Sequence, residues 1–85
     1  MRATVLLFAL AREKAGRPAL SVDLPETATV ADLKSALALA CPSLAPLLPT
    51  IRLAINSEYA TDDQHIPPGA ELAAIPPVSG GSSPN

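Results

Sequence analysis

The sequence predicts a small α+β domain in which one main helix packs across one face of a β-sheet. Two observations carry this prediction. Short apolar or alternating runs, separated by glycine and proline, indicate several strands. One longer segment between Thr29 and Cys41 repeats its apolar residues at helical spacing. With 85 residues, the chain is long enough for a single domain with one economical core.

The first two strands are predicted to form a hairpin. Residues 4–10 are a continuous apolar run, which is typical of a mid-sheet strand with both faces at least partly covered. Residues 11–16 are polar and end in glycine, so we expect them to turn the chain back. Residues 19–24 then alternate apolar with smaller or polar side chains, which indicates a second strand with one apolar face.

Pro25 ends that strand, and the main helix begins after it. Thr29 is the expected N-cap, because Asp32 three residues later completes a variant of the capping box. Pro42 disfavours the α conformation at Cys41 and so ends the helix there. The apolar residues at i, i+3, i+7 and i+10 form the stripe that we expect to face the sheet: Val30, Leu33, Leu37 and Ala40.

Three prolines make residues 41–50 an irregular crossover. We expect its three leucines to fill the edge of the core: Leu44, Leu47 and Leu48. Residues 51–56 alternate as a strand, with Ile51, Leu53 and Ile55 inward and Arg52, Ala54 and Asn56 outward. A turn at residues 56–58 leads to a short strand at residues 59–60. A polar loop then ends in the turn Pro67-Pro68-Gly69. The last strand, residues 71–75, places Leu72 and Ala74 on one face and Glu71, Ala73 and Ile75 on the other.

The C-terminal segment has the most specific composition in the chain. Residues 1–77 form the predicted domain, and Pro76-Pro77 end its last strand as an extended spacer, because proline lacks a backbone donor. Residues 78–81 are a predicted flexible tail whose two glycines can enter a channel too narrow for side chains. Residues 82–85 form an extension that places the carboxyl group beyond Gly81.

Composition excludes several classes of function. Six basic and eight acidic residues give a net charge of −2 without a basic run, which argues against nucleic-acid binding. The single cysteine, Cys41, and the single histidine, His65, predict a metal-free chain in a reduced compartment. The N-terminal apolar run faintly resembles a signal peptide, but it is far shorter than a membrane span. We therefore expect a cytoplasmic protein without membrane contact.

Over residues 1–81 the chain resembles the small, sulfur-carrying subunit of molybdopterin synthase. The shared features are the first strand running into Ala11-Arg12-Glu13, the segment from Ala54 to Tyr59, and the ending Pro76-Pro77-Val78-Ser79-Gly80-Gly81. The resemblance implies a ubiquitin-like β-grasp fold, a mixed sheet with the first and last strands side by side at its centre.

The resemblance also implies a carrier that has no active site of its own. An E1-like enzyme would use ATP to adenylate the carboxylate of Gly81, and sulfur would replace AMP to give a thiocarboxylate. The tail, Val78, Ser79, Gly80 and Gly81, would then enter the large synthase subunit, in a heterotetramer, and donate sulfur to a pterin precursor. The carrier would bind no cofactor directly. Pro76-Pro77 would set the direction in which the tail leaves.

Members of this family bind their partners through an apolar patch on the sheet face away from the helix. By position, the matching residues are Phe8, Tyr59 and Ile75, followed by Pro76 and Pro77, and strand alternation independently places Ile75 on that outward face. Aromatic anchors are enriched at interfaces. The simpler interpretation is that Phe8 and Tyr59 complete a small core or cover a sheet.

Residues 82–85 depart from the family pattern, because they would block adenylation of Gly81. Either a peptidase removes them, or they are a remnant outside the natural chain, or the chain is not a sulfur donor. Two alternative functions stay open: a sulfur carrier for thiamine, cysteine or tRNA thiolation, and a ubiquitin-like binding module whose tail is inert.

Overall fold

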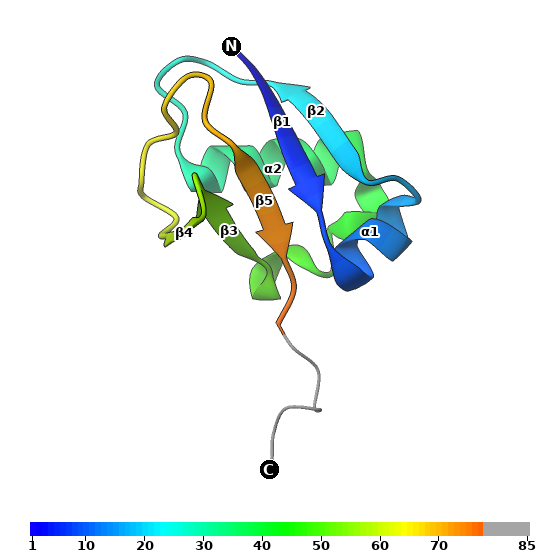
Figure 1. The fold of residues 1–85 in the computed structure, drawn as a ribbon. Helices are drawn as coiled ribbons and strands as arrows, with labels where there is room; N and C mark the ends of the chain where they lie inside the picture. Colours follow the sequence, from blue (N-terminus) through cyan, green and yellow to red (C-terminus); the bar gives the residue numbers. More distant parts are fainter. Residues whose placement is uncertain (78–85) are drawn as a thin grey trace.

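The computed structural model describes residues 1–77, so the predicted tail Val78, Ser79, Gly80 and Gly81 and the extension after it lie outside the described residues. The domain boundary after residue 77 stays a prediction. The described elements follow one another in this order: β1 (Arg2–Leu7), α1 (Ala9–Ala15), β2 (Ala19–Asp23), α2 (Val30–Ala40), the 3-10 helices η1 (Pro42–Leu44) and η2 (Leu48–Thr50), β3 (Arg52–Ile55), β4 (Glu58–Ala60) and β5 (Leu72–Ile75) (Figure 1).

The strands form one mixed sheet in the order β2-β1-β5-β3-β4. β1 runs parallel to β5, whereas the pairs β1–β2, β3–β5 and β3–β4 are antiparallel. The first and last strands therefore lie side by side, with β5 at the centre, as the resemblance implied. The predicted α+β class is confirmed.

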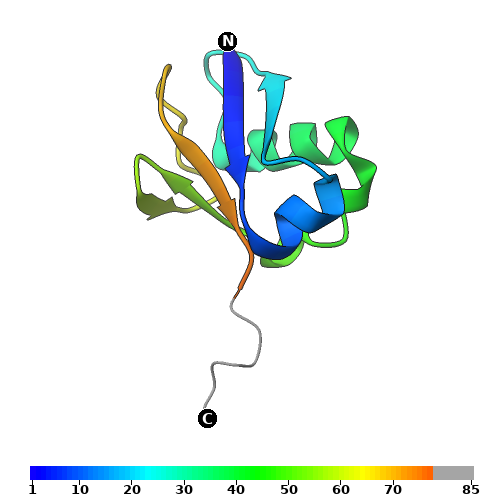
Figure 2. The same cartoon turned by 45° about the vertical axis from the view of Figure 1, so that its right-hand side comes forward.

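A single hydrophobic core lies between the sheet and α2, which crosses one face of the sheet (Figures 1 and 2). Alternate residues of every interior strand point into this core, because successive side chains of a strand face opposite sides. The helix adds Val30, Leu33 and Leu37, each fully buried. Leu44 and Leu48 are buried in the crossover, which confirms their predicted role at the edge of the core.

The predicted capping box of α2 is present. The Thr29 hydroxyl accepts a hydrogen bond from the backbone N–H of Asp32 at 3.3 Å, and the Asp32 carboxylate accepts one from the Thr29 N–H at 3.0 Å. One member of the predicted stripe is wrong, because Ala40 is exposed. Ten residues at 3.6 per turn bring Ala40 about 80° around the helix from Val30, so the last turn leaves the buried face.

The connection between β1 and β2 corrects the sequence prediction. The two strands pair as expected of a hairpin, but β1 ends at Leu7, and residues 9–15 form the helix α1 instead of a turn. Alanine, leucine, arginine, glutamate and lysine all favour helix. Gly16 ends the helix in the left-handed conformation at φ 75°, and its N–H donates to the Arg12 carbonyl.

The predicted turn between β3 and β4 is present but is one residue shorter than expected, because Glu58 already belongs to β4 and pairs with Ile55. Asn56 and Ser57 both have positive φ, 52° and 73°, which is the pattern of the type I′ turn that suits the twist of paired strands. Asn56 also exchanges hydrogen bonds with Glu71 through its backbone N–H (2.8 Å) and its side-chain oxygen (2.9 Å). These bonds hold the hairpin against the start of β5.

Candidate functional site

An apolar patch lies on the sheet face opposite α2. It surrounds a hollow of about 370 Å³, and Ser57 and Glu71 lie at its margin. Both helices lie on the other side of the sheet, as Figure 2 shows, and no helix of the described chain covers this face. We call the following residues the outer-face patch: Leu6, Phe8, Ala54, Tyr59, Ala73 and Ile75.

The strand register assembles this patch from four strands. Leu6 of β1 lies opposite Ala73 of β5, Ala73 lies opposite Ala54 of β3, and Ala54 lies opposite Tyr59 of β4. Phe8 follows β1 directly, and its N–H donates to the Ala74 carbonyl at 3.3 Å. The patch is therefore a continuous row of side chains supported by backbone pairing.

The predicted residues Phe8, Tyr59 and Ile75 meet in this patch. Phe8 is 46% exposed and Tyr59 is 60% exposed, so neither completes the core, which closes beneath them with aliphatic side chains. The chain thus keeps its only two aromatic residues at the surface on one face. Clustered exposed apolar side chains are typical of a protein-binding site.

Sequence reasoning missed two features of the outer face. Leu6 belongs to the patch and is 37% exposed, and the prediction that both faces of β1 are at least partly covered did not identify it as a patch residue. Alternation with the buried Val5 and Leu7 could have placed Leu6 outward. Ala54 points to this face as predicted but is buried, because it is small and lies between Ala73 and Tyr59 in the register.

The chain leaves the sheet beside the patch. β5 ends at Ile75, which is partly buried, and the two prolines follow. Pro76 is buried, whereas Pro77 is exposed. Of the two prolines predicted to bind a partner, only Pro77 therefore offers its side chain at the surface.

The remaining candidate groups do not form a chemical site. Cys41 is partly buried with its Sγ 3.3 Å from the Ser43 hydroxyl, and His65 is exposed. Within residues 1–77, no three His, Cys, Asp or Glu side chains are placed to hold a metal ion. In the same part of the chain, no helix has the length and apolarity that crossing a membrane requires.

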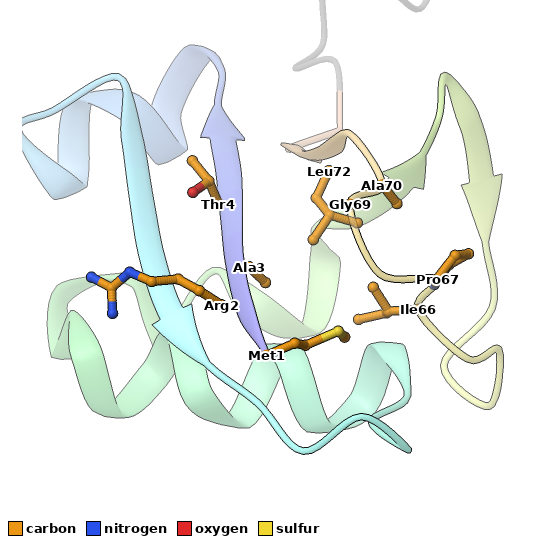
Figure 3. A pocket seen from close by; sticks show the side chains of 9 residues that line it. All are labelled: Met1, Arg2, Ala3, Thr4, Ile66, Pro67, Gly69, Ala70 and Leu72. Atoms are coloured by element: carbon orange, nitrogen blue, oxygen red, sulfur yellow. The ribbon is translucent and has the colours of Figure 1, made fainter.

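A second hollow, of about 230 Å³, lies at the opposite end of the sheet, between the start of β1 and the turn before β5 (Figure 3). Small and apolar residues line it, among them Ala3, Ile66 and Ala70. Its charged side chain, Arg2, extends away from the hollow toward β2 and pairs with Asp23 at 3.1 Å. We therefore assign the functional site to the outer-face patch and the strand end beside it.

The mixed sheet with adjacent first and last strands, one helix across its inner face and an exposed apolar patch on its outer face together define a ubiquitin-like β-grasp protein. The ThiS family model matches residues 5–81. The chain belongs to the ThiS family.

Individual relatives agree with this assignment. The molybdopterin synthase sulfur carrier subunit of Arabidopsis thaliana is 44% identical over 77 residues, which cover 91% of this chain and 80% of that protein. The protein of the same name in Dictyostelium discoideum is 39% identical over 80 residues, with 91% and 93% covered. Among solved structures, SAMP1 from Haloferax volcanii has a TM-score of 0.84 at 35% identity, covering 95% of this chain and all of that one (100%).

Proposed function

We propose that this protein is a sulfur carrier subunit of molybdopterin synthase and that it carries sulfur as a thiocarboxylate on Gly81. The observation that supports this proposal best is the position of the outer-face patch. It lies along β5, the strand that leads into the Pro-Pro-Val-Ser-Gly-Gly segment. The names of the curated relatives favour molybdopterin over the other sulfur pathways.

The chemistry needs only an accessible carboxyl group from this chain. In the first step, a carboxylate oxygen of Gly81 attacks the α-phosphorus of ATP on an E1-like enzyme, and pyrophosphate leaves. Hydrosulfide from a sulfur donor then attacks the acyl carbon, AMP leaves, and loss of the remaining proton from sulfur gives the thiocarboxylate. The partner enzymes supply the bases and the charge stabilisation that these steps require.

The outer-face patch docks the carrier on the large synthase subunit so that the tail reaches the reacting pterin precursor. Four residues in extended conformation span about 14 Å, which is enough to cross the wall of a partner's active site. Glycine at positions 80 and 81 leaves this route free of side chains. Phe8 and Tyr59 serve as the aromatic anchors of the docked complex.

Residues 82–85 must be absent for Gly81 to be adenylated, since the acyl carbon of Gly81 is otherwise part of a peptide bond. The family match also ends at residue 81. A tail-trimming peptidase that cleaves after Gly81 is therefore part of the proposal.

Reconstitution with purified partners tests the proposed function. A chain ending at Gly81 is incubated with the E1-like enzyme, ATP and a sulfur donor, and the carboxyl group is examined by mass spectrometry. We expect a thiocarboxylate on this chain and none on the chain that ends at Asn85. As a control, the same activating enzyme must modify its known carrier. If it does so but forms a thiocarboxylate on neither of the two chains, the proposal is contradicted.

A further inference from the structure

The basic residues of the described chain are concentrated at the end of the sheet where β5 ends. Because β1 and β5 are parallel, α1 follows β1 at this same end, and β3 begins there opposite Ile75. Four of the six basic residues lie in α1, in the connection from α1 to β2, or at the start of β3: Arg12, Lys14, Arg17 and Arg52. The acidic residues at this end are Glu13 in α1 and, after β4, which ends beside the start of β3, Asp62 and Asp63.

The other two basic residues are already paired within the chain. Arg2 contacts Asp23 at 3.1 Å, and Lys34 contacts Asp62 at 2.9 Å. By contrast, no carboxylate lies within ion-pairing distance of Arg52 among residues 1–77. The charge of Arg52 is therefore available to a partner.

Arg52 also has a defined place on the outer face. It is exposed, its Cα lies opposite Ile75 in the β3–β5 register, and its guanidinium lies 5.1 Å from the centroid of the Tyr59 ring. This cation–π contact holds a long side chain over the outer-face patch. Arg52 thus joins the patch to the end of the strand from which the tail leaves.

We propose that Arg52 is a partner-recognition residue, whose guanidinium forms an ion pair with a carboxylate of the large synthase subunit beside the entrance for the tail. This inference rests on the proposed function. The proposed ion pair adds a charged contact to the apolar docking surface. Arg52 belongs neither to the tail motif nor to the aromatic anchors.

Two physical arguments support this role. A guanidinium stacked on an aromatic ring is already partly ordered, so less side-chain freedom is lost when it binds a carboxylate. Arg12, Lys14 and Arg17 add positive charge at the same end of the molecule, and such charge speeds the association of a partner whose binding surface is acidic. Arg52 then sets the orientation of the partner that this charge attracts.

The test measures binding of the purified large subunit to a set of variants of the chain that ends at Gly81. Arg52→Lys keeps the charge, Arg52→Gln removes it, and Arg52→Glu reverses it. Arg2→Gln is the matched control, because it removes an exposed arginine at the opposite end of the sheet. Thermal unfolding of each variant confirms that the fold is retained.

We expect affinity to fall in the order Lys, Gln, Glu, with Arg52→Glu at least about 10-fold weaker than wild type in about 50 mM NaCl. At about 500 mM NaCl the variants should converge, because salt screens the ion pair. Arg2→Gln should bind like the wild type at both salt concentrations.

The possible failures are distinguishable. If the wild-type chain does not bind the large subunit at all, the proposed function fails. If the wild type binds but Arg52→Gln and Arg52→Glu bind as tightly as the wild type, with the same salt dependence, Arg52 forms no ion pair with the large subunit and the inference is overturned. Equal weakening by Arg2→Gln would overturn it as well, since the effect would then be one of net charge.

Discussion

Truncation of Phe8 to alanine should weaken docking without abolishing the fold. Phe8 is 46% exposed in the free chain. A phenylalanine side chain offers roughly 200 Å² for burial, so a partner that covers the patch removes about 90 Å² of it from water. At about 25 cal/mol per Å², this burial stabilises the complex by about 2 kcal/mol. The variant Phe8→Ala should therefore bind the large subunit roughly 30-fold more weakly.

The assay is titration calorimetry of the large subunit with wild type, Phe8→Ala and the control Leu39→Ala. Leu39 is also a large apolar residue and is 84% exposed, but it belongs to α2, which packs on the opposite face of the sheet. Circular dichroism verifies that each variant is folded at the assay temperature. An unchanged affinity for Phe8→Ala, or an equal loss for Leu39→Ala, would refute docking through the outer-face patch.

Three further predictions concern the fold that supports the site. Ser57→Gly should stabilise the protein by about 0.5–1 kcal/mol, because glycine adopts φ 73° without strain; thermal unfolding checks this. Leu37→Ala should cost about 3 kcal/mol by leaving a cavity in the core, and a denaturant midpoint equal to that of the wild type would contradict it. The Thr61 hydroxyl donates to Asp63 at 2.6 Å and lowers the pKa of that carboxyl below its ordinary 3.8. The stabilising contribution of this hydrogen bond to the ionised carboxylate is therefore present above pH 3.8 and lost as pH falls through the lower folded pKa of Asp63. In the variant Thr61→Val, NMR titration should show the pKa of Asp63 returning toward 3.8.

The inner face of the sheet was predictable because local rules decide it. Alternation identified the buried residues of β2, β3 and β5, and the capping box located the start of α2 at Thr29. The order of the strands was not contained in these patterns, since alternation is the same for any neighbour. It came from the resemblance, and the register of β1 with β5 confirmed it.

The features that the sequence prediction missed have two different physical causes. The run Phe8-Ala9-Leu10 continues the apolar composition of β1, so a helix that begins at Ala9 was read as strand. The helix formers after it and the glycine at position 16 were the signals that could have identified α1. The exposure of Leu6 and the role of Arg52 depend on which face of the sheet lacks a helix, and that is a tertiary property.

The most direct test of the sulfur carrier function is the intact mass of the protein isolated from its own cells. The account predicts a chain that ends at Gly81, with a fraction heavier by the difference between sulfur and oxygen at the carboxyl group. A stable population that ends at Asn85, with no shorter form while molybdenum cofactor is being made, would contradict it. The protein would then be better described as a ubiquitin-like binding module.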